Sequence, residues 1–273
     1  MNTRFGLIIV GDEILSGKRA DKHFSKVIEL LGTRGLALTW AEYVGDDPDR
    51  IVRILERAFA SGDVVFSTGG IGATPDDHTR QCAARALGRA LALHPGAEAL
   101  IRERMQDLAR EQGVEYDAER PDNVHRLNMG VFPLGASLIP NPYNKIPGFS
   151  CTAGNGGGVY FVPGFPVMAW PMIEWVLDTQ YSHLFNRSPR LERSVIVYDT
   201  MESLLTPLMQ QIEREHSAIK VFSLPSVDHP QHGRHIELGV KGPTEQVPAA
   251  WTMLLNGLHE LGARVGTDMV RKL

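Results

Sequence analysis

The stretch Thr68-Gly69-Gly70-Ile71-Gly72-Ala73-Thr74-Pro75-Asp76-Asp77-His78-Thr79 predicts a turn that links a strand to a helix. It follows an apolar run over residues 63–67 and precedes an alanine-rich helical pattern over residues 81–91. Its glycines remove the β-carbons that would keep a ligand away, and free N–H groups at a helix start carry partial positive charge. The loop is therefore a candidate site for phosphate.

An acidic pair, Asp76 and Asp77, lies beside this loop. Two carboxylates repel a bare phosphate unless a divalent cation or a proton sits between them. The alternative is a turn with a purely structural role, in which Asp76 only caps the helix. We expect metal-assisted phosphate chemistry, with the cap and the metal both open as roles for Asp76.

Similar turns end the two preceding apolar runs. The predicted strand over residues 6–10 leads into Gly11-Asp12-Glu13, and the predicted strand over residues 36–44 leads into Gly45-Asp46. Helical patterns follow each of them, over residues 21–31 and from Pro48 onward, with Asp47 as the expected N-cap. This β-α-β-α-β-α order predicts a parallel, doubly wound sheet whose carboxyl-end loops gather into one site.

The middle of the chain is less regular. Residues 95–119 read as a charged helix, residues 130–139 as strand with turns, and residues 141–148 as a loop. A last apolar strand over residues 159–162 ends at Pro163-Gly164-Phe165-Pro166, where the glycine permits close approach of a backbone to a ligand.

Beyond residue 185 the pattern changes. Strands are expected over residues 190–198, 219–224 and 235–240, and helices over residues 202–216 and 245–261. That order is typical of a small α+β domain. We therefore expect one domain over residues 1–180 and a second over residues 188–273, joined by a linker between Thr179 and Ser188.

The composition excludes several classes of protein. The 273 residues are 43% hydrophobic and 22% charged, which is ordinary for a globular protein, and the net charge of −4 gives no basic field for nucleic acid. The two cysteines, Cys82 and Cys151, make neither a disulfide scaffold nor a metal spacing. With no signal or membrane-spanning run, we expect a cytoplasmic protein without a membrane partner.

Four spaced blocks together resemble the molybdopterin-binding domain superfamily, and within it the amino-terminal half of the competence/damage-inducible CinA proteins. They are Gly11 to Lys18, Val44 to Asp47, Thr68 to Asp77 and Pro163 to Pro166. The likeness spans roughly residues 5–170. The carboxyl-terminal part is similar to the KH-like module of that family, with Glu202-Ser203 at the start of a helix, although the turn after His216 lacks the Gly-x-x-Gly loop that clamps RNA.

The resemblance implies a three-layer α/β/α domain that binds molybdopterin or an adenine nucleotide. Relatives adenylylate molybdopterin or hydrolyse the pyrophosphate of ADP-ribose with a divalent metal, and both reactions act on a phosphoanhydride. Matching positions give Asp46 and Asp77 as active-site acids. The further residues that it implies are the phosphate loop, Gly69, Gly70, Gly72 and Thr74, and the first acidic turn, Asp12 and Glu13.

One departure bears on activity. The family block Leu-Pro-Gly-x-Pro-x-Glu-Met has Met168 in place of its acidic residue, which favours binding without turnover. Asp21 and His23 stand where CinA-like chains tend to show asparagines. The printed sequence ends at Leu273, so nicotinamide mononucleotide deamidation by a further domain is not expected.

The leading hypothesis is a site for molybdopterin or an adenine-nucleotide phosphoanhydride, in which Asp46 and Asp77 hold Mg²⁺ and act catalytically. A CinA-type pyrophosphatase acting on ADP-ribose or FAD and a non-catalytic binding module are the alternatives. We expect a homo-oligomer, and for His229, His232 and His235 an ordinary loop rather than a metal site. The expected ligand-binding residues are Gly11, Asp12, Glu13, Ser16, Gly69, Gly70, Gly72, Thr74, Asp76, Asn141, Lys145, Pro163 and Gly164.

Overall fold

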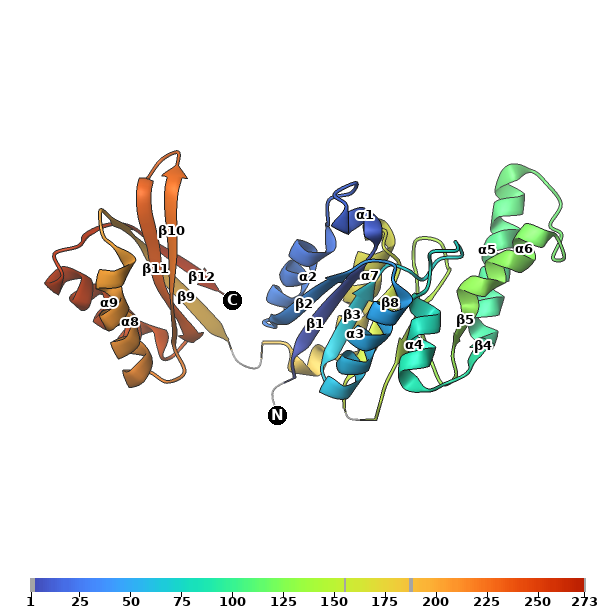
Figure 1. Ribbon diagram of the computed structural model, residues 1–273, viewed down its shortest axis with the longest axis horizontal. Helices are drawn as coiled ribbons and strands as arrows, with labels where there is room; N and C mark the ends of the chain where they lie inside the picture. Colours follow the sequence, from blue (N-terminus) through green and yellow to red (C-terminus); the bar gives the residue numbers. More distant parts are fainter. Residues whose placement is uncertain (1–2, 155, 187–188, 273) are drawn as a thin grey trace. The chain divides into compact units, whose positions relative to one another are not determined.

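A computed structural model describes residues 3–154, 156–186 and 189–272 (Figure 1). The chain forms two compact units, Met1–Leu31 with Ala37–His183, and Gly32–Leu36 with Leu184–Leu273. The expected boundary at Ser188 and the end at Leu273 lie outside the described residues. Each unit is described by itself below.

The first unit is built on a six-stranded sheet. Its strands follow the order β2 (Leu38–Val44), β1 (Phe5–Val10), β3 (Val64–Thr68), β8 (Gly158–Val162), β7 (Gly148–Cys151) and β6 (Ser137–Ile139). The first four run parallel, and β7 is antiparallel to both of its neighbours. The expected doubly wound sheet is confirmed over the parallel strands, whereas the sequence did not indicate β7.

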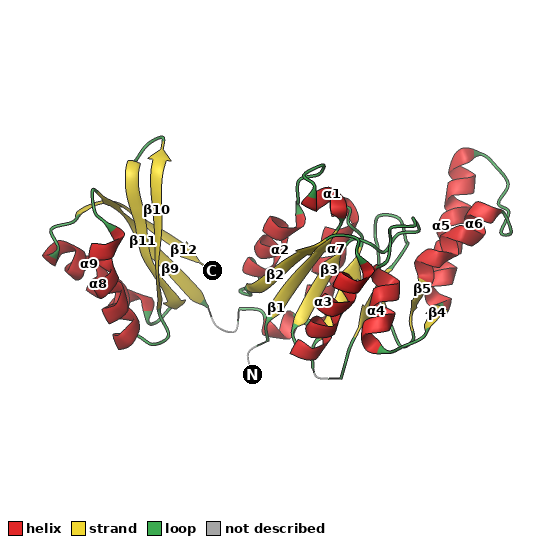
Figure 2. Ribbon diagram, viewed as in Figure 1, coloured by secondary structure: helices red, strands yellow, loops and turns green. Residues whose placement is uncertain are grey.

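Helices cover both faces of this sheet (Figures 1 and 2). On one face lie α2 (His23–Gly32) and α7 (Pro166–Gln180), where Lys26 stacks over the ring of Trp170. On the other lie α3 (Pro48–Ser61) and α4 (Thr79–Leu87), joined by an Asp49–Arg85 ion pair. The unit is therefore a three-layer α/β/α domain, as expected. Asp47 caps α3 by accepting from two backbone N–H groups.

An arm connects α4 to the second half of the sheet. It contains α5 (Pro95–Gln112), α6 (Pro121–Arg126), the 3₁₀ helix η1 (Leu127–Gly130) and an antiparallel pair, β4 (Leu91–Leu93) with β5 (Val131–Pro133). Two expected helices were too long. Gly88 and Gly113 adopt φ of +61° and +66° at the C-caps of α4 and α5, and such left-handed residues end helices.

The second unit is a four-stranded antiparallel sheet, with the order β10 (Lys220–His229), β11 (Gly233–Pro243), β9 (Arg190–Tyr198) and β12 (Arg264–Lys272). The helices α8 (Glu202–Glu215) and α9 (Val247–Glu260) pack on one face, around a core that includes Leu205, Trp251 and Leu238. The α+β prediction is confirmed. The expected β-α-β-β-α order omits β12, whose alternation is broken by an irregularity between Val265 and Asp268.

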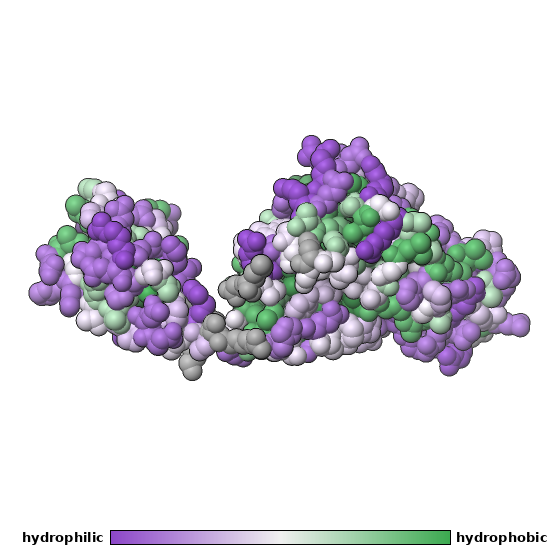
Figure 3. Space-filling model, turned by 90° about the horizontal axis from the view of Figure 1, so that it is seen from below, coloured by the Kyte–Doolittle hydropathy of each residue, from purple (hydrophilic) through white to green (hydrophobic). Residues whose placement is uncertain are grey.

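Two minor elements complete the described chain, the short helix α1 (Asp12–Leu15) and the 3₁₀ helix η2 (Ser182–Leu184). Figure 3 shows hydrophilic and hydrophobic residues interspersed over the visible face of each unit. Among the described residues, no helix has the length and apolar character needed to cross a membrane.

Candidate functional site

The glycine loop between β3 and α4 lies where two neighbouring parallel strands end. Gly69 donates its N–H to the Val162 carbonyl at 3.0 Å, and a β-carbon on Gly69 would stand 2.3 Å from the Val10 carbonyl oxygen. Gly69 and Gly70 have φ of +97° and +69°, which disfavours any side chain there. These contacts explain why the loop needs its glycines.

Most backbone carbonyls of this loop already have partners. Thr79 donates its hydroxyl to the Gly69 carbonyl and its N–H to the Gly70 carbonyl, at 3.1 and 3.0 Å. Further along, the side chains of Arg80 and His125 bond the carbonyls of residues 72 and 73, at 2.6 and 2.9 Å. Donors of the protein itself therefore occupy most of the carbonyl oxygens of the loop.

The donor side of the loop is different. Within the described part of the chain, the backbone N–H groups of residues 70, 71, 72 and 73 have no hydrogen-bond partner. Runs of consecutive N–H groups in glycine-rich turns form anion-binding concavities. The loop thus has four consecutive donors available to an anion.

Asp77 shapes the far end of the loop. Its Oδ2 accepts from the Thr74 N–H at 2.8 Å and from the Thr74 hydroxyl at 2.6 Å. Asp76 does not cap α4, because His78 occupies the N-cap position and makes no side-chain cap. That alternative for Asp76 was wrong, and Asp76 instead lines the cavity described below.

The two other acidic turns are joined to each other. Asp12 donates its backbone N–H to Asp46 Oδ2 at 3.0 Å, and Asp46 donates its own to Asp12 Oδ1 at 3.2 Å. Burial raises the pKa of Asp46 above its ordinary value. The hydrogen bond from Asp12 opposes this shift, and the negative charges of Asp12, Glu13 and Asp76 add to it. Asp46 therefore sits among like charges, where a cation would be stabilised.

A cavity of about 690 Å³ opens at this edge of the sheet, and small-molecule sites commonly have volumes of roughly 300–1,000 Å³. Most of the expected site residues line it. They are Gly11, Glu13, Asp46, Gly69, Gly70, Gly72, Thr74, Asp76, Asp77, Asn141, Pro163 and Gly164. Asp12, Ser16 and Lys145 are not among its lining residues.

One wall of the cavity comes from the reversed strand. Because β7 is antiparallel to β8, with Phe149 opposite Phe161, its amino end lies at the carboxyl edge of the parallel strands. The loop that precedes β7 therefore reaches the cavity, where Asn141 donates its amide to Asn144 Oδ1 at 2.8 Å. Sequence reasoning found Asn141 but missed Asn144, since nothing indicated the reversal.

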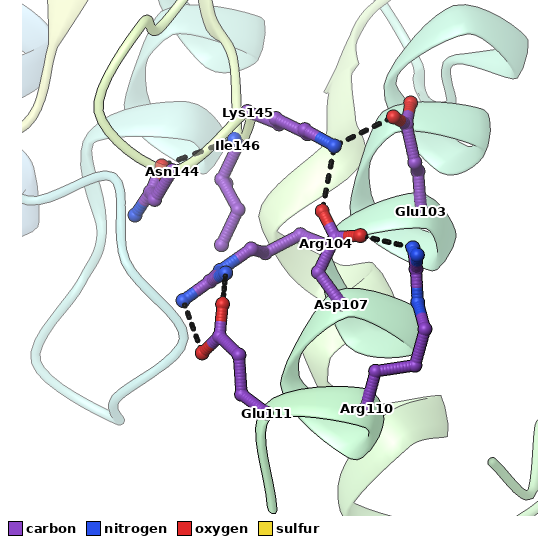
Figure 4. A network of polar contacts seen from close by, with 8 residues as sticks. All are labelled: Glu103, Arg104, Asp107, Arg110, Glu111, Asn144, Lys145 and Ile146. Carbon is purple, nitrogen blue, oxygen red and sulfur yellow. Dashed lines mark hydrogen bonds and ion pairs between the residues drawn. The ribbon is translucent and has the colours of Figure 1, made fainter.

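The side chain of Lys145 reaches toward Glu103 and Asp107, as Figure 4 shows. Its Nζ contacts Glu103 Oε1 and Asp107 Oδ2 of α5, each at 2.6 Å. The hydrogen bond that Lys145 donates to Asp107, then the one that it donates to Glu103, raises the pKa of Lys145. Its backbone has φ of +65°, a conformation that few side chains adopt. Its contacts join the cavity loop to the arm, and the structure gives it no contact in the cavity.

Other lining residues add basic and apolar character. Lys18 and Arg19 line the cavity, and the guanidinium of Arg19 lies 5.8 Å from the ring centre of Phe165. Met168, at the position of the family's acid, also lines it and accepts a weak hydrogen bond from Asn144 Nδ2 at 3.4 Å. Arg19 directly follows the block Gly11 to Lys18, and Phe165 belongs to the block Pro163 to Pro166, although neither was among the expected site residues.

No group of three or more His, Cys, Asp or Glu side chains among the described residues is arranged to hold a metal ion. His229, His232 and His235 cluster at the tip of the β10–β11 hairpin, with ring centres 4.9 to 5.5 Å apart. His232 is hydrogen-bonded to the Tyr198 hydroxyl at 2.8 Å. The carboxylates of the cavity would therefore need oxygens from a ligand to complete a cation's coordination.

The fold and cavity define a class: a three-layer α/β protein with its candidate ligand site at the carboxyl edge of a mostly parallel sheet. Residues 6–193 match the model of the family described as "probable molybdopterin binding domain", and the chain belongs to this family. The resemblance expected from the four motif blocks is thereby confirmed.

Relatives support the narrower likeness. The chain is 30% identical to a CinA-like protein of Syntrophotalea carbinolica over 205 residues, or 74% of this chain and 47% of that protein. A protein of Pyrobaculum calidifontis is 30% identical over 88% of both chains. A crystal structure of CinA from Thermoplasma acidophilum, described as of unknown function, aligns at 27% identity with a TM-score of 0.55, covering 64% of this chain and 98% of that one.

The chain spans about half the length of that CinA-like protein. It is also 31% identical to a putative competence-damage inducible protein of Alkaliphilus metalliredigens, of whose length it covers 38%.

Proposed function

We propose that this protein binds a phosphate-bearing pterin or nucleotide, molybdopterin or an adenine nucleotide with a phosphoanhydride, in the cavity at the glycine loop. The family description supports the pterin, and the likeness to CinA proteins supports ligand binding in this family. The cavity volume suits a ligand of this size.

One observation carries the proposal. Four consecutive N–H groups, those of residues 70–73, have no partner among the described residues and stand beside a cavity, while the carbonyls of residues 69, 70, 72 and 73 are hydrogen-bonded. Gly70, Gly72 and Ala73 are partly exposed, so these donors are open to a ligand that enters the cavity. Phosphate oxygens are acceptors without a donor of their own when ionised, so they complement this arrangement.

A divalent cation fits the remaining chemistry of the cavity. Mg²⁺ usually takes one or two protein carboxylates and obtains other ligands from substrate phosphates and water. In this proposal Asp46 holds the ion, because like charges surround its carboxylate. Asp77 contributes Oδ1, since its Oδ2 is already bonded to Thr74. When bound, the ion would neutralise negative charge on phosphate oxygens.

The chain's own residues would do the rest. The loop N–H groups orient one phosphate, and Lys18 and Arg19 add positive charge at the cavity. Asn141 uses both of its amide hydrogens within the loop, on Asn144 Oδ1 and on the Ile146 carbonyl, so it holds this wall of the cavity in place. Asn144, whose Nδ2 also donates to Met168 Sδ, keeps one N–H for a polar edge of a ligand. Phe165 offers an apolar ring to a flat heterocycle.

Hydrolysis of a pyrophosphate, with ADP-ribose or FAD as substrate, is the second candidate. The cluster of acids around Asp46 favours it, since such a site can hold a metal beside a phosphoanhydride. Met168 in place of the family's acidic residue favours binding without turnover.

Two measurements test the proposal. Calorimetric titration with inorganic pyrophosphate, AMP and ADP, each with and without Mg²⁺, should show binding that strengthens with Mg²⁺. Absence of binding for every probe would contradict it. Incubation with ADP-ribose, FAD or ATP plus Mg²⁺, Mn²⁺ or Co²⁺, followed by detection of AMP, then separates the pyrophosphatase from a binding module.

A further inference from the structure

We propose that Arg80 and His125 are positioning residues of the anion site: from outside the cavity, they hold the carbonyls of Gly72 and Ala73 so that the neighbouring N–H groups stay available to phosphate. The inference rests on the proposed function of the glycine loop. It names the two side chains that keep the loop in its binding form.

Arg80 lies on the first turn of α4, directly behind the loop. It is 4% exposed, and its Nη2 donates to the Gly72 carbonyl at 2.6 Å while its Nη1 donates to the Asn128 carbonyl in η1. One guanidinium therefore joins the glycine loop to the base of the arm. Neither contact is available to a shorter or apolar side chain.

The charge of Arg80 is unusual because it is buried without an ion pair. Arg80 makes no ion pair within the described residues, and its buried Nε has no hydrogen-bond partner. Burial lowers the pKa of Arg80, against the attraction of Asp77. A buried cation without a paired anion is costly to a fold, so a bound anion close to the loop would offset that cost.

His125, which belongs to the arm, holds the next carbonyl of the loop, that of Ala73. It lies in α6 and donates from Nε2 to the Ala73 carbonyl at 2.9 Å, since a carbonyl oxygen can only accept. Its other ring nitrogen, Nδ1, is 3.4 Å from the Asn128 amide. Asn128 thus contacts both positioning residues, through its carbonyl to Arg80 and through its side chain to His125.

The physical effect on the anion follows from the orientation of a peptide group. A carbonyl oxygen turned toward a phosphate repels it, whereas one held away by a donor leaves the adjoining N–H groups to the ligand. A donor that is itself charged makes a shorter and stronger hydrogen bond. Arg80 therefore acts twice, through the geometry of the loop and through the positive potential beneath it.

Two substitutions at each position test this, with inorganic pyrophosphate as the probe in the presence of Mg²⁺. Arg80→Met removes charge and donors from a side chain of similar length, and Arg80→Lys keeps the charge and one donor. His125→Ala removes the donor, and His125→Gln restores an N–H near the place of Nε2. Arg85→Met, on the exposed face of the same helix, is the matched control.

Roughly tenfold weaker pyrophosphate binding is expected for Arg80→Met, a smaller loss for Arg80→Lys, and none for Arg85→Met. His125→Ala should weaken binding severalfold, and His125→Gln should recover most of it. A second readout is hydrogen exchange of the amides of residues 70–73. Pyrophosphate should slow it in the native protein and in His125→Gln, and far less in Arg80→Met and His125→Ala.

Failure of the positioning role and failure of the proposed function give different results. If Arg80→Met or His125→Ala folds and binds pyrophosphate within twofold of the native protein, with the same protection of residues 70–73, the positioning role is wrong. Should Arg80→Met fail to fold, the exposed His125 pair decides alone. If the native protein binds no pyrophosphate with or without Mg²⁺, the proposed function fails and this inference with it.

Discussion

Asp77 closes the glycine loop on Thr74: one carboxylate oxygen accepts both the backbone N–H and the hydroxyl of Thr74, and the Asp77 N–H returns a bond to the Thr74 carbonyl at 3.0 Å. These three bonds form a compact turn directly after the N–H groups of residues 70–73, which have no partner in the described part of the chain. The structure therefore gives Asp77 a role in shaping the loop, besides the metal role that we propose for it.

This dual role makes Asp77 testable. Asp77→Ala should lower the free energy of unfolding by roughly 1–2 kcal/mol, because two hydrogen bonds are lost. Asp77→Asn keeps an oxygen acceptor for Thr74, so it should unfold like the native protein while losing part of the effect of Mg²⁺ on pyrophosphate binding. Urea unfolding and calorimetric titration measure the two effects. Equal stability of both variants would contradict the shaping role.

The glycines of the loop differ in what surrounds them. A β-carbon on Gly69 would meet the Val10 carbonyl oxygen at 2.3 Å, whereas one on Gly113, at the end of α5, would meet nothing within 4 Å. Both residues have positive φ. Gly113→Ala should therefore cost roughly 1 kcal/mol from backbone strain alone, and Gly69→Ala roughly 3 kcal/mol or more. Similar unfolding midpoints for the two variants in urea would contradict the close approach.

The pKa of Asp46 predicts a pH dependence of stability. Its folded-state pKa is raised above the ordinary 3.8, so ionisation of Asp46 destabilises the fold. That penalty is absent below pH 3.8 and complete above the raised value. In metal-free buffer, Asp46→Asn should gain stability over the native protein as pH rises through this window, by less than about 1 kcal/mol, because solvent screens a partly exposed carboxylate.

The control for this measurement is Gln112→Ala, an exposed position at the end of α5 in the same unit. Neither side chain titrates, so the stability of this variant relative to the native protein should not change across the same window. With Mg²⁺ and pyrophosphate present, the native protein should be stabilised more than Asp46→Asn. If the native protein instead became more stable relative to Asp46→Asn as pH rises in metal-free buffer, the predicted direction of the pKa shift of Asp46 would be wrong.

Met168→Glu restores an acid at the family's position. The new carboxylate would join Glu13, Asp46 and Asp76 at the cavity, so pyrophosphate alone should bind several times more weakly. Mg²⁺ should then increase affinity by a larger factor than in the native protein. Titrations with and without Mg²⁺ measure the ratio, with Met168→Gln as the uncharged control. An unchanged ratio would place residue 168 outside the reach of the bound ion.

Lys145→Met tests whether this lysine binds phosphate or only joins the cavity loop to α5 through its ion pairs. Since Nζ is held by Glu103 and Asp107, the substitution should leave pyrophosphate affinity unchanged and lower the thermal midpoint only slightly. Glu103→Gln, which removes one partner without touching Lys145, should resemble it. A severalfold loss of affinity in Lys145→Met but not in Glu103→Gln would return Lys145 to the list of phosphate contacts.

Much of the first unit could be predicted because its signals are local. Buried parallel strands appear as short apolar runs, and the pair Asp47-Pro48 marks a helix start from neighbouring residues alone. The glycine loop likewise carries its own pattern. Twelve of the fifteen expected site residues line the cavity, and all twelve lie in the segments that follow β1, β2, β3, β6 and β8.

The failures depend on contacts between distant residues. The direction of β7 is set by its pairing with β8, and residues 148–151 carry no mark of that direction. Arg80 looks like an ordinary helix residue until Gly72 and Asn128 are seen around it. Lys145 resembles a free basic side chain, since its two partners are about forty positions away along the chain.

The reversal of β7 has a consequence for how this fold diversifies. The loop between β6 and β7 joins two antiparallel strands. It can be lengthened or shortened without changing any right-handed crossover, because those crossovers connect the parallel strands. Sliding β7 by one residue would instead turn its own side chains to the opposite face of the sheet. Changes of length are thus open to the rim that the loop before β7 forms, while Gly69 ties the opposite strand ends to the core.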